Sequence, residues 1–459
     1  MSLNFQATRF QCTWPWETLV MLCDGRVVCG CADPYAKRVV GDARTSSIEA
    51  IWRGPVLDRL RHEMNAAGSD FCGDCPLKRP LETGEVPTQR GVEVGRHPGR
   101  MFIECTAACN ISCNQAICAP ETGITRTRQA GMLDFDLFTR VIDEVGPSLG
   151  RIDFFNYGEA FLHKRAVEMC EYIKSRYPHI YVYTSTNGTA FSEEQARRLV
   201  HSGIDEVTFS IDGAKAESYV QYRQRGKFEV ALRNLRAMVE EKRRSGRDLP
   251  QINWRYILFK WNDSDEEMAL ARQLAAEIGV DRLCWEITDH PEDSFSRRFA
   301  KGTADFERIR RETWDDSNLG NAIPGATPRA RIDVKAPPAW LRWFKGEGLR
   351  ARAGTPTVIE TRVHNLSTRP FVADATYGRR LVRLGAQLCS EDGRLLNLDY
   401  ARARLPGPIG PGQAAEIRIE LPPLAESGRY RLKFDLVSEG VEWFEKCGSA
   451  TTSVPLVVS

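Results

Sequence analysis

Apolar residues follow two alternating patterns through the middle of the chain. Short apolar runs, which are typical of buried strands, recur between segments with helical apolar spacing. The predicted strands are 101–103, 152–155, 181–184, 206–211, 251–259 and 282–287, and the predicted helices are 165–175, 193–202, 228–244 and 264–278. Alternating βα units with short connections predict an α/β fold, with parallel strands in a doubly wound sheet or in a full or partial barrel.

Beyond about residue 330 the pattern changes to short alternating runs, at 357–363, 380–388, 417–421, 430–436 and 454–458. Turn-forming words divide these runs, among them Glu391-Asp392-Gly393 and Gly410-Pro411-Gly412. This pattern predicts an antiparallel, immunoglobulin-like β-sandwich over residues 330–459.

Length and composition narrow the function classes. A chain of 459 residues is too long for one ordinary core, so two or three domains are expected. A formal charge of +2 does not indicate the strongly basic surface that binding to nucleic acid or to an anionic membrane would need. No apolar run has the length of a membrane span and no export signal is recognisable, so a cytoplasmic protein is expected.

Fourteen cysteines then favour metal binding over disulfides in a reducing compartment. Four of them follow the strand at 101–103 within fourteen residues: Cys105, Cys109, Cys113 and Cys118. Three thiolates on one loop can hold three irons of a cubane and leave the fourth iron open.

Six further cysteines lie in residues 1–80: Cys12, Cys23, Cys29, Cys31, Cys72 and Cys75. A hairpin is predicted at 19–22 and 27–28, and Ser46 or Ser47 can cap a helix that runs through Ile48 to Leu57. Cysteine pairs brought together by a small α+β module indicate a metal site, and spacing alone favours zinc.

The loop after residue 103 resembles the cluster loop of radical S-adenosylmethionine (SAM) enzymes, in which a threonine and a C-N-L-x-C word follow the first barrel strand. Thr106, Cys109, Asn110, Ile111 and Cys113 match that pattern. The resemblance implies a partial (β/α)6 TIM-type barrel over residues 100–325, with a [4Fe-4S] cluster and SAM as cofactors.

The third cysteine departs from the family spacing, because position 116 is Ala116. Cys118 is preferred to Cys105, since Cys105 sits where the strand ends and ligation needs mobile loop backbone. The implied catalytic ligands are Cys109, Cys113 and Cys118.

Residues 1–80 resemble the SPASM or twitch module of the same enzymes, which carries an auxiliary [4Fe-4S] cluster. The matching words are C-x-x-P-W from Cys12, D-G-R-V-V from Asp24 and the final C-x-x-C. The implied ligands are Cys12, Cys72 and Cys75, with either Cys29 or Cys31. Unlike the usual arrangement, the module here precedes the barrel, and a linker is predicted at 81–99.

Short sequence motifs at the ends of successive strands complete the resemblance. Their position matters because ligands in such folds bind at the carboxyl ends of the strands. Asn-Tyr-Gly-Glu-Ala at 156–160 resembles the family's G-G-E-P word, which grips the SAM amino group. Each word alone is also an ordinary turn, cap or surface charge. The implied SAM-binding residues are Tyr157, Gly158, Glu159, Asn187, Ser210 and Arg223.

The resemblance implies reductive cleavage of SAM to a 5′-deoxyadenosyl radical, which abstracts hydrogen from a substrate. A peptide is expected from the module, or a saccharide from the weak similarity of the sandwich to those of some bacterial saccharide-modifying enzymes. A low-potential donor such as flavodoxin or ferredoxin would supply the electron. The alternative is an iron–sulfur electron-transfer or scaffold protein that has lost SAM cleavage.

Overall fold

The computed structural model describes residues 9–81, 84–87, 89–113, 131–288, 294–313, 329–335, 348–367, 371, 373, 382–438 and 442–459. Its contacts divide the chain into two compact units, residues 1–314 and 315–459, and each is described by itself. Across the described residues, no helix combines the length and the apolar character that a membrane crossing requires.

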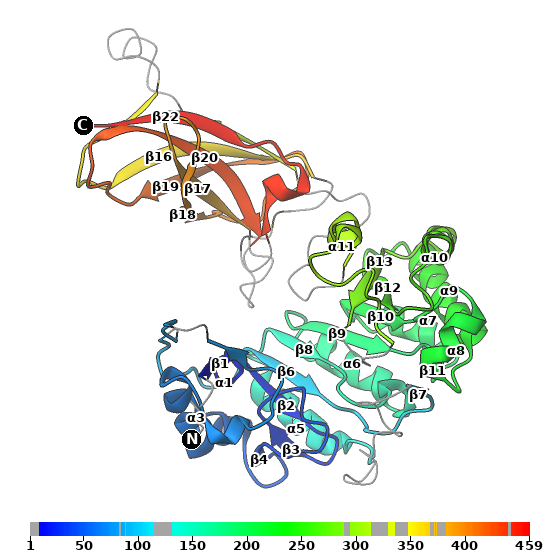
Figure 1. Ribbon diagram of the computed structural model, residues 1–459. Coiled ribbons are helices and arrows are strands. Elements are labelled where there is room, and N and C mark those ends of the chain that lie inside the picture. The colour runs from blue at the N-terminus through cyan, green and yellow to red at the C-terminus, as the bar shows by residue number, and fades with distance from the viewer. Residues whose placement is uncertain are drawn as a thin grey trace, which may run out of the picture. The chain divides into compact units, whose positions relative to one another are not determined.

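Within the described part of the first unit, nine strands form one open sheet (Figure 1). Its central strands are parallel neighbours in chain order, as the alternating pattern predicts. They are β6 (Arg100–Ile103), β8 (Arg151–Asp153), β9 (Tyr181–Thr186), β10 (Glu206–Ser210), β12 (Gln251–Leu258) and β13 (Arg282–Ile287). The predicted parallel α/β core is confirmed.

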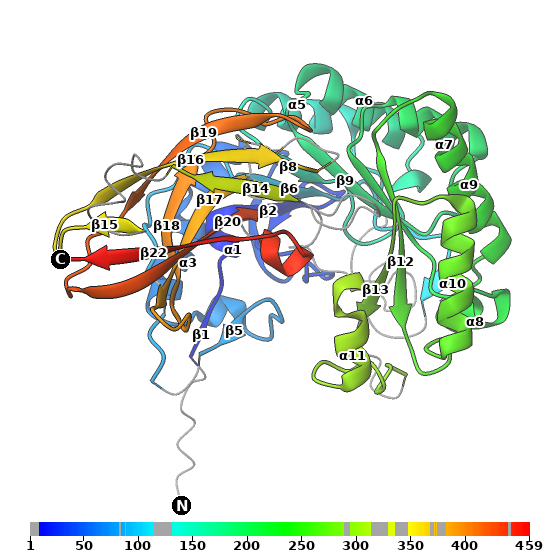
Figure 2. The same ribbon diagram turned by 90° about the horizontal axis from the view of Figure 1, so that it is seen from above.

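Helices cover the outer face of this sheet as an arc (Figure 2). They are α5 (Phe135–Val145), α6 (Ala166–Arg176), α7 (Glu193–His201), α8 (Ala216–Tyr222), α9 (Phe228–Arg244) and α10 (Asp265–Ile278). Helix α5 shows why they pack there, because Leu137, Phe138, Val141, Ile142 and Val145 form one buried stripe at helical spacing. A capping box of Ser192 and Gln195 begins α7.

The N-terminal cysteine-rich segment continues the same sheet. Strand β2 (Thr18–Met21) runs parallel to β6, with Leu19 opposite Met101. The hairpin to β3 (Arg26–Val28) and then β4 (Val39–Asp42) extends the edge. The segment predicted as a separate small module therefore shares its sheet with the barrel strands.

One predicted helix of this segment is wrong at its end. Ser47 caps α2 (Ile48–Trp52) by accepting a hydrogen bond from the Ala50 amide at 3.1 Å, as predicted. The helix stops there, and α3 (Pro55–Asn65) begins anew after Gly54. Proline lacks the amide that a continuing helix would need but fits the first helical turn.

A buried arginine ties these helices together. Arg61 donates to the Trp52 carbonyl at 2.8 Å and to the Pro15 carbonyl at 2.9 Å. Its guanidinium also stacks 4.6 Å from the Trp52 ring.

The shorter elements of this unit are β1 (Phe10–Gln11), α1 (Trp14–Glu17), the 3-10 helices η1 (Asp70–Cys72), η2 (Ala160–Leu162) and η3 (Arg310–Glu312), β5 (Arg79–Pro80), β7 (Ser112–Cys113), β11 (Arg223–Gln224) and α11 (Ala304–Ile309).

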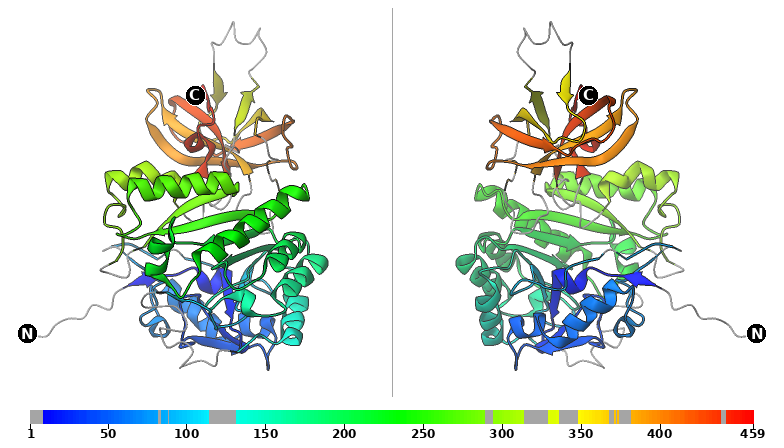
Figure 3. Two further views of the ribbon diagram at one scale, coloured as in Figure 1. Left: turned by 90° about the vertical axis from the view of Figure 1, so that its right-hand side faces the viewer. Right: turned by 90° about the vertical axis from the view of Figure 1, so that its left-hand side faces the viewer.

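The second unit consists of two sheets around one apolar core (yellow to red in Figure 3). One sheet contains β14 (Ala330–Val334), β16 (Thr357–Asn365) and β19 (Ala414–Leu421); the other contains β15 (Leu349–Ala351), β17 (Val382–Ser390), β18 (Leu395–Arg404), β20 (Gly428–Ser438), β21 (Glu442–Trp443) and β22 (Thr452–Val458), with the 3-10 helix η5 (Phe444–Cys447) after β21. Side chains such as Val363, Ile419, Leu384 and Phe434 meet between the sheets. The predicted antiparallel pattern holds, except that β15 pairs with β22 in parallel. The immunoglobulin-like class stays a prediction.

Candidate active site and second cysteine site

The cysteine loop leaves β6 and is fixed by its own threonine. Thr106 accepts a hydrogen bond from the Ala108 amide at 3.1 Å and donates to the Gly131 carbonyl at 2.8 Å. Cys113 lies in β7, which pairs with β11 so that Cys113 is opposite Arg223. Cys118, the predicted third ligand, falls outside the described residues.

Gly158 brings the loop after β8 against the cysteine loop. Its φ of +81° is left-handed, and a Cβ there would lie 2.4 Å from the Thr106 carbonyl oxygen and 2.6 Å from that of Ala108. The next amide, that of Glu159, donates to the Ala108 carbonyl at 2.8 Å. Only glycine therefore allows this close approach of two backbones.

The Glu159 carboxylate links this loop to the end of β9. It accepts hydrogen bonds from the Thr186 hydroxyl at 2.8 Å and the Asn187 amide at 2.7 Å. It also accepts from the Phe161 amide at 3.3 Å and so caps η2. Burial raises the pKa of Glu159, against the effect of these donors. Glu159 therefore acts as a cap and also lines the cavity described below.

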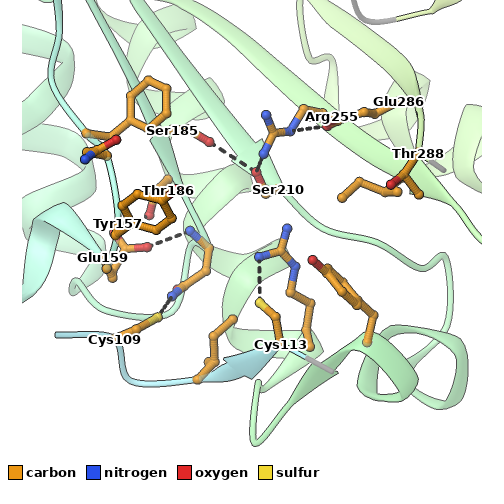
Figure 4. Close-up of a pocket in the computed structure, with 18 of the residues that line it drawn as sticks. Cys109, Cys113, Tyr157, Glu159, Ser185, Thr186, Ser210, Arg255, Glu286 and Thr288 are labelled. Carbon is orange, nitrogen blue, oxygen red and sulfur yellow. Dashed lines mark hydrogen bonds and ion pairs between the residues drawn. The ribbon is translucent and has the colours of Figure 1, made fainter. Parts of the chain in front are cut away.

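Cys109 and Cys113 each receive a hydrogen bond from a nitrogen donor (Figure 4). The Asn187 side chain donates to Cys109 Sγ at 3.8 Å, and Arg223 donates to Cys113 Sγ at 3.4 Å. Arg223 also holds Asp212 through an ion pair of 2.5 Å. Burial acts to lower the pKa of Arg223, but Asp212 and Cys113 outweigh it and raise the pKa. This permanent positive charge favours the thiolate form that binds metal.

The structure brings these predicted residues around one cavity of about 290 Å³. The predicted residues that line it are Cys109, Cys113, Tyr157, Gly158, Glu159, Asn187, Ser210 and Arg223. They come from the ends of β8, β9 and β10, from the loop that follows β6, and from the short strands β7 and β11. Two thiols with hydrogen-bond donors, facing a cavity of this size, fit a metal cluster with a ligand beside it.

Four further polar residues line the same cavity and were missed by sequence reasoning: Ser185, Arg255, Glu286 and Thr288. Arg255 donates to the Ser210 hydroxyl at 3.0 Å and pairs with Glu286 at 3.0 Å. None of the four belongs to a recognisable sequence motif. Strand alternation places Arg255 and Ile257 on one face of β12 and is the signal that could have found Arg255.

Glu104 is another missed residue, next to the cysteine loop. It is completely buried and accepts hydrogen bonds from the Cys23 amide at 3.2 Å, the Asn156 side chain at 3.2 Å and the Tyr157 amide at 3.3 Å. One carboxylate thus joins the N-terminal segment, β6 and the loop after β8.

A second, smaller cavity of about 20 Å³ lies in the N-terminal segment. Four cysteines line it together: Cys12, Cys29, Cys72 and Cys75. Cys31, the open alternative to Cys29, instead packs beside the apolar side chains of Val20, Leu22 and Phe102. The structure therefore brings Cys29, and not Cys31, to the other three thiols.

The four thiols are close enough to influence one another. Burial, and then the charges of Cys12, Cys72 and Cys75, raise the pKa of Cys29. Burial and the neighbouring thiols raise the pKa of Cys72 to about 11. A set of four cysteines fits an iron–sulfur cluster, which binds the thiolate forms. Among the described residues, no three Cys, His, Asp or Glu side chains are arranged to hold a single metal ion.

Two family models match this chain. The radical SAM superfamily matches residues 103–271, and the iron–sulfur cluster-binding domain SPASM matches residues 12–76. The first range includes the cysteine loop and the strand ends around the larger cavity. The second includes the four cysteines around the smaller one.

Individual proteins match over part of their length. The tungsten-containing aldehyde ferredoxin oxidoreductase cofactor-modifying protein of Pyrococcus furiosus is 28% identical over 185 residues, 40% of this chain and 49% of that protein. The mycofactocin maturase MftC of Mycolicibacterium smegmatis is 28% identical over 212 residues, 45% of this chain and 48% of that protein. The chain thus spans about half the length of these relatives.

Among solved structures, SuiB of Streptococcus suis bound to S-adenosylmethionine is 13% identical, with a TM-score of 0.35 over 46% of each chain. With both family models placed on the two cysteine sites, the chain belongs to the radical SAM superfamily and carries a SPASM iron–sulfur domain on the N-terminal side of its barrel strands.

Proposed function

We propose that this radical SAM enzyme cleaves SAM reductively to a 5′-deoxyadenosyl radical, which abstracts hydrogen from a peptide or saccharide substrate. The observation that carries the proposal is the convergence of Cys109, Cys113, Glu159, Asn187 and Arg223 on one cavity. Membership of the superfamily implies a [4Fe-4S] cluster and SAM. In the proposal, Cys109, Cys113 and Cys118 hold that cluster.

When bound, the cluster supplies the electron that splits the sulfonium of SAM, received from a donor such as flavodoxin or ferredoxin. The chain's own residues bind SAM and orient it. Glu159 accepts the SAM ammonium, Asn187 and Ser210 bind ribose hydroxyls, and Arg223 adds the positive charge that the SAM carboxylate needs. Tyr157 and Gly158 present backbone carbonyls at the same place. The surrounding walls of the cavity keep water from the radical.

Cys12, Cys29, Cys72 and Cys75 would hold the auxiliary cluster that the SPASM domain implies. Strand pairing between β2 and β6 supports a fixed relation between the two cysteine sites, because β2 follows Cys12 and β6 precedes the loop of Cys109 and Cys113. A rigid spacing of this kind suits a second cluster that exchanges an electron with the reaction.

Formation of 5′-deoxyadenosine tests the proposal. The reconstituted, reduced full-length protein should convert SAM to 5′-deoxyadenosine and methionine in equal amounts. Cys113→Ala should reduce this rate by more than a hundredfold, because it removes a cluster ligand. Cys389→Ala, which changes a buried cysteine of the second unit, should retain it. A wild-type protein that holds both clusters but releases no 5′-deoxyadenosine is the electron-transfer or scaffold protein instead.

A further inference from the structure

One wall of the active-site cavity carries an ion pair, Arg255 with Glu286, that we do not assign to SAM. Arg255 of β12 and Glu286 of β13 form an ion pair of 3.0 Å, and Arg255 also donates to Ser210. The Ser210 hydroxyl lies 3.2 Å from that of Ser185. Figure 4 shows this chain of contacts on the side of the cavity away from Cys109 and Cys113.

The side chains of this pair are more exposed than those of two other ion pairs in the first unit. The side chains of Arg255 and Glu286 are 20% and 31% exposed, and both line the cavity. In the Arg100–Asp153 pair the values are 12% and 0%, and in the Arg223–Asp212 pair they are 11% and 0%. The Arg255–Glu286 pair is therefore the more accessible one, on the cavity side.

An apolar surface lies near this charged wall. Phe155 lines the cavity and contacts Tyr183 edge to face, with ring centroids 5.3 Å apart. Phe102 stands behind Phe155 at 5.7 Å. Tyr183 also affects the pKa of Arg255. Burial acts to lower this pKa, but the charges of Glu286 and Tyr183 have the larger effect and raise it. Arg255 therefore stays charged within reach of an aromatic wall.

We propose that Arg255, held in place by Glu286, binds a carboxylate of the substrate, and that an apolar group beside that carboxylate packs against Phe155. A guanidinium offers a planar fork of donors that matches a carboxylate. Before the substrate binds, Glu286 balances the charge of Arg255, so that the guanidinium is not left as an unpaired buried cation. The proposal rests on the proposed function and deepens it, because it names the substrate class: an acidic group next to an apolar one, as in a peptide carboxylate.

Binding of a small probe tests this without any SAM cleavage. Isothermal titration of the cluster-loaded full-length protein would use 3-phenylpropionate, with neutral 3-phenylpropanamide as its matched control. The carboxylate should bind at least roughly tenfold tighter than the amide, since hydrogen bonds to charged groups are the stronger ones. Binding should persist when SAM is already bound.

Two variants should shift the affinity for the probe in opposite directions. Arg255→Gln should weaken binding at least roughly tenfold, and Glu286→Gln should strengthen it severalfold, because it removes the charge that opposes the carboxylate. Arg165→Gln, at an exposed surface pair, is the matched control and should change nothing. A purely structural ion pair would weaken with either substitution. Equal binding of both probes, no binding, or competition with SAM would overturn the proposal, whatever the outcome for 5′-deoxyadenosine.

Discussion

Leu19 of the N-terminal segment pairs in parallel with Met101 of the first barrel strand. Leu19 stands a few positions after Cys12, and Met101 stands a few positions before the loop of Cys109 and Cys113, so neighbouring strands of one sheet adjoin the two cysteine-containing segments. A domain that precedes the barrel in the sequence thereby becomes part of the barrel's own edge. Backbone pairing of β2 with β6 therefore joins the two segments directly.

Gly158 should be the least replaceable glycine of the active site. Gly158→Ala should destabilise the first unit by about 2 to 4 kcal/mol, because left-handed strain adds to a clash with two carbonyls. Gly246→Ala has a similar φ of +63° but nothing within 4 Å, so it should cost only about 1 kcal/mol. Urea unfolding followed by circular dichroism measures both. Equal losses would mean that the contact with the cysteine loop is not tight.

Cys29 should be the fourth ligand of the auxiliary cluster. Cys29→Ala should lower the iron content from roughly eight to about four per chain, since a [4Fe-4S] cluster needs its thiolates. Cys31→Ala should leave roughly eight, because Cys31 lies among apolar side chains. Iron analysis after anaerobic reconstitution measures both. Loss of iron from the Cys31 variant alone would assign the ligand the other way.

The choice between these cysteines shows where sequence reasoning ends. Residues two apart point to the same side of an extended strand, so alternation could not separate Cys29 from Cys31. The path of the chain after β3 separates them, and that path depends on contacts beyond the strand, such as the hydrogen bond that the Cys29 amide donates to the Arg38 carbonyl. The barrel strands and strand-end words were predictable, because apolar runs and turn residues act locally.

Arg255 and Glu286 illustrate a second limit. Each is a charged residue within a largely apolar strand, and only the register of β12 on β13 brings them together. Strand β18 was missed for another reason: its first five residues, Leu395 to Asp399, are all exposed, so the run lacks the alternation of a half-buried strand.

Cys118 should be the third ligand of the SAM-binding cluster, and Cys105 should not. Cys105 is 1% exposed within the apolar core, and it does not line the cavity. Cys118→Ala should therefore abolish 5′-deoxyadenosine formation, whereas Cys105→Ala should retain most of it. Chromatography of the SAM products measures both. The reverse result would assign Cys105, Cys109 and Cys113 as the ligands.

Asp435 should make the second unit less stable as the pH rises. Burial raises the pKa of Asp435 to about 7, although the amides of Leu436 and Glu445 donate to it at 2.8 Å. Its unfolded pKa is near 4, so this contribution to stability is fully present below about pH 4 and decreases as the pH rises from 4 to 7, where the folded form binds more protons than the unfolded form. The contribution is lost once the pH has risen through about 7.

Asp435→Asn removes the titration and isolates its contribution. The free energy of unfolding of wild type minus that of the variant should fall by about 2.5 kcal/mol between pH 5 and pH 8. Hydrogen exchange of the β17 and β20 amides, followed by mass spectrometry on the full chain, measures it. A constant difference over this range would show that Asp435 is charged throughout.

The most direct test of the central claim is electron paramagnetic resonance of the reduced protein with and without SAM. Cys72→Ala combined with Cys75→Ala should leave about four irons, and the signal of that remaining cluster should change when SAM is added. Cys109→Ala combined with Cys113→Ala should also leave about four irons, with a signal that SAM does not change. A SAM response that survives in the second variant, or is missing from the first, would contradict the assignment of SAM to the cavity of Cys109 and Cys113.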